Sequence, residues 1–185
     1  IPRWVKTVGT AAFEGCSSLV AIDVDDDNAK LSSDGGLLYN KYQSQLLRCP
    51  ENASPKALPE LLSSFADAAF SGCKKIREIT IPQYVTSLPK YCFAFCEYLE
   101  TVELNQCLTH IGQSAFEGCT RLKNISLPQS LRSIGDYAFA YCASIEELPL
   151  PENITEIGRD ENKENMRSGC TFYGCKSLKH IEIPN

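Results

Sequence analysis

Residues 122–142, LKNISLPQSLRSIGDYAFAYC, form one complete copy of a unit that recurs along the whole chain. The last apolar residue of its Ile-x-Leu tripeptide is Leu127. Counting this residue, the equivalent positions along the chain are Ile1, Val24, Leu58, Ile81, Leu104, Leu127, Leu150 and Ile183. The spacings are 23, 34, 23, 23, 23, 23 and 33 residues, so two intervals exceed 23 by 11 and 10. A fixed period in this range is typical of repeat proteins. The 185-residue chain is therefore predicted to form a single solenoid of seven coils, with insertions in the coil 24–58 and near 159–168.

Short extended segments are predicted within each unit. The tripeptide at 125–127 alternates apolar and polar residues, which is typical of a half-buried strand. Residues 131–134 indicate a second short strand, Gly135 a turn, and residues 138–139 a single helical or 3₁₀ turn. Because the apolar spacing never keeps a 3.6-residue period over ten residues, no long helix is expected.

Neighbouring coils must stack, because one unit is too small to bury its own apolar face. Stacking should place phenylalanine on phenylalanine and cysteine on cysteine along the axis. Six of the ten cysteines share the context Phe-x-x-Cys, namely Cys16, Cys73, Cys96, Cys119, Cys142 and Cys175. A free buried cysteine behaves as a small apolar residue, so these thiols are interpreted as packing residues, as is Cys92. A disulfide among Cys49, Cys107 and Cys170 stays an open alternative.

The motifs Leu-x-x-Ile-x-Leu-Pro, Leu-x-x-Ile-Gly-x-x-Ala-Phe and Gly-Cys resemble the leucine-rich repeats of the BspA-like family, as in LTHIGQSAFEGC at 108–119. Residues 22–50 are similar to a hairpin-bearing coil of that family, with arms at 37–39 and 45–47 and a turn at 40–44. The resemblance implies a leucine-rich-repeat solenoid, β-rich, with short parallel strands and short helical or 3₁₀ turns. It also implies a non-enzymatic, cell-surface or secreted module for protein binding or adhesion, with host extracellular proteins as partners. A structural or intracellular scaffold without a host ligand is the alternative, since unpaired cysteines suit a reducing compartment.

Several residues depart from the repeat. Pro149 lies inside a strand tripeptide and removes a ladder donor, so a local defect in the strand ladder is expected there. Asp25 and Asn105 stand where proline follows the strand in other units. Phe95 and Tyr141 replace the glycine of Gly-Cys, which indicates that this position does not require a positive φ.

Composition excludes several classes of protein. The chain is 43% apolar and 22% charged with a net charge of −5, and it carries no Lys/Arg cluster. Nucleic acids and anionic membranes are therefore not expected partners. No apolar run approaches the roughly 18 residues of a transmembrane helix, and no signal peptide is visible. Both ends of the sequence fall in mid-repeat without a polar capping unit, so the chain is expected to be part of a longer protein.

No catalytic, cofactor-binding or metal-ligating residue is predicted. The two histidines, His110 and His180, fall on different segments three coils apart, so no Ser-His or Cys-His pair is expected. The acidic run from Asp23 to Asp34 imitates a calcium loop, but Asn28 occupies the glycine position and Asp34 replaces the bidentate glutamate. A solvated acidic turn is the favoured interpretation.

Two surfaces are candidates for partner binding. The outward strand positions of successive coils should form an acidic face that includes Asp23, Glu78, Glu103, Glu147, His180 and Glu182. This face either docks a basic partner or only keeps an exposed sheet from associating. Aromatic residues gather at loop positions, namely Tyr91, Phe95, Tyr98, Tyr137 and Tyr141, with Ser114 and Gly118 leaving a shallow gap between them. They either mark an interaction site or pack over the turns as additional core.

Overall fold

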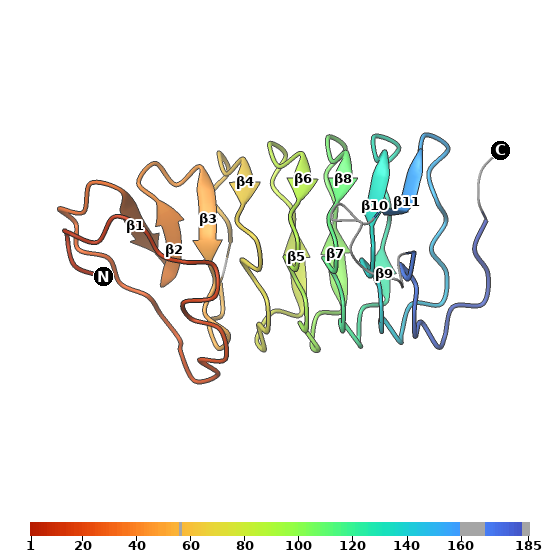
Figure 1. The fold of residues 1–185 in the computed structure, drawn as a ribbon, viewed down its shortest axis with the longest axis horizontal. Coiled ribbons are helices and arrows are strands. Elements are labelled where there is room, and N and C mark those ends of the chain that lie inside the picture. Colours follow the sequence, from red (N-terminus) through yellow and green to blue (C-terminus); the bar gives the residue numbers. More distant parts are fainter. Residues whose placement is uncertain (56, 160–168, 183–185) are drawn as a thin grey trace.

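The structure, a computed structural model, describes residues 1–55, 57–159 and 169–182, and the chain winds into an elongated β-solenoid (Figure 1). Its strands lie in two rows along the long axis, and its parallel ladders cover about five turns. The strands are β1 (Leu31–Asp34), β2 (Leu37–Asn40), β3 (Gln45–Arg48), β4 (Ser64–Phe65), β5 (Glu78–Thr80), β6 (Ser87–Leu88), β7 (Thr101–Glu103), β8 (His110–Ile111), β9 (Asn124–Ile125), β10 (Ser133–Gly135) and β11 (Glu156–Arg159).

Two parallel sheets carry the repeat. The Ile-x-Leu segments form the sheet β5-β7-β9, in which Glu78, Thr101 and Asn124 lie side by side. The second segments form the sheet β6-β8-β10-β11, in which Ser87, His110, Ser133 and Glu156 lie side by side. Both registers advance by 23 residues per strand, which confirms that one sequence repeat makes one coil.

The hairpin predicted in the first insertion is confirmed. Strands β2 and β3 pair antiparallel, and β3 then pairs parallel with β4, so the hairpin joins the solenoid edge to edge. Strand β1, which the sequence pattern did not predict, adds to the outer side of β2. The buried Asn28 accepts hydrogen bonds from the backbone of Lys30 and Leu31 at the start of β1 and donates to two carbonyls of the first coil.

A column of phenylalanine rings runs through the core, as predicted. Phe70, Phe93, Phe116, Phe139 and Phe172 stack in nearly parallel planes, with centroid distances of 4.8, 5.4, 5.3 and 6.0 Å. A cysteine column accompanies it, because the thiols of Cys96, Cys119, Cys142 and Cys175 each donate to a phenylalanine carbonyl of the preceding coil at 3.1 Å. Each coil is therefore tied to the one before it through its core.

The interpretation that the Gly-Cys position does not require a positive φ is wrong. Phe95 and Tyr141 adopt φ values of 58° and 60°, in the same region as Gly118 at 72°. Their amide groups donate to the next coil, from Phe95 to the Glu117 carbonyl and from Tyr141 to the Tyr173 carbonyl, both at 2.6 Å. These bonds between coils hold the turn in its left-handed shape whatever the side chain.

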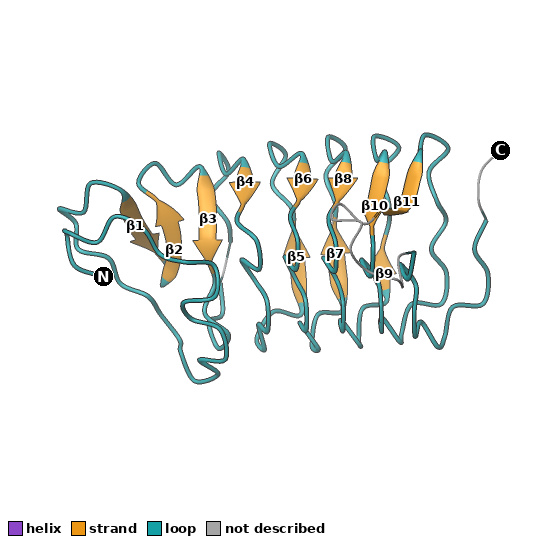
Figure 2. Ribbon diagram, viewed as in Figure 1, coloured by secondary structure: helices purple, strands orange, loops and turns teal. Residues whose placement is uncertain are grey.

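The expected helical turns are absent from the described part of the chain, which consists of strands and loops (Figure 2). Residues 138–139 lie in a hydrogen-bonded turn in which Tyr137 also has a positive φ of 54°. A residue in the left-handed region interrupts the backbone progression that a helix needs. Gly135 belongs to the end of β10 and has an ordinary φ, but a Cβ there would lie 2.5 Å from the Gln113 amide nitrogen. Glycine is thus needed for close approach of the coils.

Two further departures from the repeat have structural counterparts. Asn105 donates through its side-chain amide to the carbonyls of Pro82 and Val85 in the preceding coil, at 2.7 and 2.8 Å, so it links two coils where proline could not. The tripeptide that contains Pro149 forms no strand, and its coil meets the next through an isolated bridge between Glu147 and His180. The expected defect in the ladder is therefore present. Lys56, which stands where the repeat calls for an apolar strand residue, and nearly all of the insertion at 159–168 lie outside the described residues.

Candidate functional site

The histidines lie on different segments, as expected, since His110 belongs to β8 and His180 to an isolated bridge, but one of them has a serine partner. His110 of β8 lies next to Ser133 of β10, with 2.6 Å between Nδ1 and Oγ, which corrects the expectation that no Ser-His pair forms. The sequence separation of 23 residues hid this contact, because it depends on the register between coils. The backbone of His180 forms an isolated parallel bridge with Glu147. The His110–Ser133 contact has the geometry of an ordinary cross-strand side-chain pair.

The acidic run near the N-terminus is tied to the first coil. Arg3 lies 3.9 Å from an Asp25 carboxylate oxygen and 3.2 Å from one of Asp27. Asn28 is buried and uses its amide to join backbone segments. Within the described residues, no three His, Cys, Asp or Glu side chains are grouped to hold a metal ion.

The structure joins none of the cysteines in a disulfide, and six of the ten are buried. Burial raises the pKa of the thiols of Cys92, Cys96, Cys119 and Cys142, so these groups stay neutral and unreactive in the folded state. Cys49 is buried while Cys107 is exposed, and the structure joins none of the three less constrained cysteines in a disulfide.

The outward residues of the predicted acidic face lie at several places along the solenoid. Glu78 and Glu103 lie close together on β5 and β7, where the Thr80 hydroxyl donates to the Glu103 carboxylate at 2.8 Å. Glu147 lies farther along the axis beside His180, and Glu182 is exposed two residues beyond. Asp23 is exposed in the first coil and belongs to no strand.

A row of opposite charges runs beside this face. Arg77 pairs with Glu100 of the next coil at 2.8 Å, and Lys179 pairs with Glu146 of the preceding coil at 2.6 Å. The hydrogen bond from Lys179 lowers the pKa of Glu146, and the charge of Lys123 acts in the same direction. In each of these exposed pairs a basic side chain neutralises the carboxylate. The acidic character of the face therefore rests on Glu78 and Glu103 and not on the paired residues.

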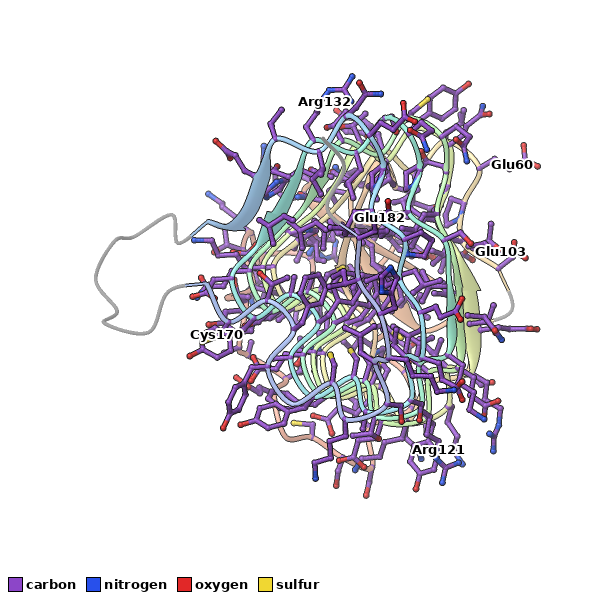
Figure 3. The ribbon with its side chains drawn as sticks, turned by 90° about the vertical axis from the view of Figure 1, so that its right-hand side faces the viewer. Glu60, Glu103, Arg121, Arg132, Cys170 and Glu182 are labelled. Carbon is purple, nitrogen blue, oxygen red and sulfur yellow. The ribbon has the colours of Figure 1, made fainter. Side chains whose placement is uncertain are left out.

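A groove opens on the acidic face beside β5. Its volume is about 910 Å³, and its lining includes Leu58, Glu60, Glu78, Ile81 and Glu103. Seen along the solenoid axis, Glu60 and Glu103 both project outward from the side that carries β5 and β7 (Figure 3). Sequence analysis named Glu78 and Glu103 but missed Glu60 and the groove, because the groove is lined by residues of successive coils and no single repeat marks it.

The aromatic residues at the turns are exposed and do not form additional core. Phe95, Tyr98, Tyr141 and Tyr173 are between 38% and 54% exposed, and Tyr91 is similar, whereas Tyr137 is half-buried. Tyr173 was not among the predicted residues. The Arg121 guanidinium lies 4.7 Å from the centre of the Tyr98 ring, which places a cation over an aromatic face.

Large and small residues alternate along this aromatic edge. The Phe95 ring lies over Gly118 of the next coil, and the Tyr141 ring lies over Gly174, where an added Cβ would come within 2.7 and 2.8 Å of a ring atom. The gap expected at Gly118 is therefore covered by Phe95. Tyr141 also meets Tyr173 edge to face at 5.3 Å, so the aromatic side chains continue from one coil to the next.

Known structures of similar fold come from bacteria. The pneumococcal vaccine antigen PcpA superposes with a TM-score of 0.80 at 22% identity, covering 98% of this chain and 43% of its own. A leucine-rich repeat protein of Bacteroides ovatus has a TM-score of 0.59 and 30% identity over 84% of this chain and 40% of its own. A leucine-rich cell surface protein of Faecalibacterium prausnitzii has a TM-score of 0.58 and 23% identity over 92% and 43%. The chain thus spans less than half the length of each of these relatives.

Among curated proteins, none matches this chain. Within the described residues, no helix is long and apolar enough to cross a membrane. The model of the BspA type leucine rich repeat region, which contains six copies of the repeat, matches residues 1–52 and 48–165. Together with the 23-residue coils and the stacked Phe and Cys columns described above, this match shows that the chain belongs to the BspA-type leucine-rich repeat family.

Proposed function

We propose that this chain is a non-enzymatic protein-binding module of a cell-surface or secreted protein, which adheres to host extracellular proteins. The aromatic edge, defined as Tyr91, Phe95, Tyr98, Tyr141 and Tyr173, is the observation that carries the proposal. Interfaces are enriched in tyrosine, phenylalanine and arginine, and exposed aromatic side chains with a polar rim mark interaction sites. Arg121 over Tyr98 adds a residue of the same class.

The fold supports the same proposal. Stacked coils present side chains at fixed spacings on a rigid frame, so a partner meets many modest contacts over an extended surface. The strained left-handed backbone at Phe95 and Tyr141 places large aromatic groups at positions where glycine fits more easily. An aromatic side chain in that position is costly for folding, which favours a role outside the fold. The surface location is supported by the description of the Faecalibacterium protein as a leucine-rich cell surface protein.

The test is biolayer interferometry of the chain against a panel of extracellular-matrix and plasma proteins, at low and physiological salt. A variant carrying Tyr98→Ala and Tyr141→Ala should lose saturable binding. The matched control is Tyr42→Ala, which removes an 88%-exposed tyrosine at the hairpin tip, far from the edge. A second variant with Glu103→Lys and Glu147→Lys tests the acidic face. Binding that survives the tyrosine variant but not the charge variant would move the site to that face.

A scaffold without a host ligand is the second candidate, because the six buried cysteines are thiols outside any disulfide and such thiols suit a reducing compartment. The full-length gene distinguishes the two, since a signal peptide upstream of this chain would support the surface module. Absence of binding by the folded chain to every protein of the panel would favour the scaffold.

A further inference from the structure

Cys49 and Cys73 come together where the hairpin joins the solenoid. Cys49 follows β3, and Cys73 lies in the coil that continues from β4, the strand beside β3 (Figure 1). Hydrogen bonds between the two segments continue past these strands. The Cys49 amide donates to the Ala69 carbonyl at 2.7 Å, and the Lys74 amide donates to the Glu51 carbonyl at 2.7 Å. The two cysteines therefore lie on facing segments of neighbouring coils.

The two thiols share one acceptor. Cys73 Sγ lies 3.7 Å from the carbonyl oxygens of both Cys49 and Pro50. Cys49 Sγ lies 3.6 Å from the same Pro50 oxygen. A hydrogen bond also joins the two thiols to each other. Both residues are fully buried, so the packing of the core keeps the two sulfur atoms together.

The other cysteines of the core column are held differently. The thiols of Cys96, Cys119 and Cys142 each donate to a phenylalanine carbonyl of the preceding coil at 3.1 Å. Oxidation of any of these three would break a short hydrogen bond in the core. The carbonyl contacts of Cys49 and Cys73 are longer, at 3.6 and 3.7 Å, and hydrogen bonds weaken with distance. This pair therefore gives up the least when it loses its protons.

The charges around the pair favour removal of a proton from Cys73. Arg48 Nη2 and Lys74 Nζ lie 3.8 and 3.9 Å from the Glu51 carboxylate, so two cations flank one anion. The hydrogen bond from the Cys49 thiol lowers the pKa of Cys73, and the charge of Arg48 acts in the same direction. The same hydrogen bond and burial raise the pKa of Cys49. Since a thiolate is the species that attacks a disulfide, Cys73 is the attacking member of the pair.

The spacing of the coils suits a covalent bridge. Neighbouring strands lie about 4.8 Å apart, and a disulfide joins residues whose Cα atoms are about 4.4–6.8 Å apart. Because the fold holds the two thiols together, folding and formation of a disulfide between them favour each other. Burial keeps an oxidant out once the solenoid has closed, so the bridge should form while the chain folds.

We propose that Cys49 and Cys73 form a disulfide that ties the hairpin to the solenoid when the chain folds in an oxidising compartment. The oxidant is a small disulfide such as oxidised glutathione. The Cys73 thiolate attacks one of its sulfur atoms and releases one glutathione thiolate. The Cys49 thiol then loses its proton and attacks the mixed disulfide, which releases the second glutathione. One S–S bond forms in the protein, one S–S bond breaks in the oxidant, and the two glutathione thiolates take up the two protons. This inference goes beyond the proposed binding function, and its test needs no partner protein.

The experiment refolds the chain from urea in buffers of increasing oxidised-to-reduced glutathione ratio. The exposed cysteines are removed by Cys16→Ser and Cys107→Ser, which prevents disulfides between chains through these positions. Remaining thiols are blocked with iodoacetamide, and tryptic peptides are analysed by mass spectrometry. The peptides 49–56 and 57–74 should be linked to each other. The link should be half-formed at a ratio about a hundredfold lower than in concentrated urea, where the fold no longer holds the thiols together.

Thermal unfolding gives a second readout. The bridged chain should melt about 5–10 °C above the reduced chain, and Cys49→Ala should abolish this difference. The control Cys119→Ala removes another buried thiol and should keep both the link and the shift in melting temperature. A dominant link between other cysteines would overturn the proposal, as would the absence of a link in a chain with native circular dichroism. Formation of the link at the same glutathione ratio in urea, or a bridged chain that melts no higher than the reduced one, would overturn the role of the fold.

Discussion

Gly118 is the position at which the relation between neighbouring coils can be tested most sharply. It combines a φ of +72° with contact to the ring of Phe95, and an added Cβ would lie 2.7 Å from a ring carbon. The substitution Gly118→Ala therefore has two costs. One belongs to the left-handed backbone, and the other to the displacement of the Phe95 ring toward solvent.

The backbone cost and the cost of displacing the ring can be estimated separately. An alanine in the left-handed region costs about 1–2 kcal/mol relative to glycine. Complete burial of a phenylalanine side chain is worth about 1.5–3 kcal/mol, and Phe95 is 53% exposed, so losing its remaining contacts costs about 0.7–1.4 kcal/mol. Gly118→Ala should lower the free energy of unfolding by about 2–3 kcal/mol, measured by urea denaturation followed by far-UV circular dichroism.

Gly15 provides a matched control. It has the same φ of +72° in the first coil, but nothing lies within 4 Å of an added Cβ. Gly15→Ala should therefore cost only the backbone share, about 1–2 kcal/mol. In a Phe95→Gly background, Gly118→Ala should also fall to that smaller cost, with a coupling of about 1 kcal/mol between the two sites. If Gly118→Ala costs the same with and without Phe95, the ring is not the obstacle and the reasoning fails.

Three other predictions concern the core and its thiols. Phe116→Ala breaks the ring column at its centre and should cost about 3–5 kcal/mol of unfolding free energy; a loss below 1 kcal/mol would mean that the stacked rings do not support one another. Because burial raises the pKa of the core thiols, the unfolded chain releases their protons above about pH 8.5 while the folded chain keeps them. The free energy of unfolding should be highest below that pH and should fall as the pH rises, by up to about 1.4 kcal/mol per pH unit and thiol. Urea titrations at pH 7 and 9.5 should show a smaller fall for the double variant Cys96→Ala, Cys119→Ala than for the unchanged chain. An equal fall would contradict the raised pKa of these two thiols. Iodoacetamide at pH 8 should label the exposed Cys16 and Cys107 quickly, and mass spectrometry that found the core thiols labelled equally fast in folded protein would refute their burial.

The repeat, the strand positions and the two core columns were predictable from the sequence alone. Their signal is periodic: the same residue types return every 23 positions, and stacking then has one solution in which like lies on like. The hairpin at β2 and β3 was predictable for a similar reason, because both of its arms lie close together in the chain.

Contacts that depend on which coil lies beside which were not predictable in the same way. The left-handed φ of Phe95 and Tyr141 is imposed by amide hydrogen bonds to the following coil, so the absence of glycine was misleading. Among the candidate site residues, Glu78 and Glu103 were identified, but Glu60 and the groove were not, because the groove is lined by residues of successive coils.

The burial of two charged residues was also not predictable from the sequence. Arg48 and Glu51 read as ordinary polar residues of an insertion, yet they are 3% and 7% exposed. Glu51 accepts the Gly15 amide at 2.7 Å, and Arg48 donates to the Ala68 carbonyl, so together they join the first coil, the hairpin and the solenoid. The sequence by itself determined the period, the strands and the core, because these repeat along the chain. The tertiary structure alone decided the turn backbone and the exposed aromatic edge, because each depends on contacts with a neighbouring coil that no single repeat contains.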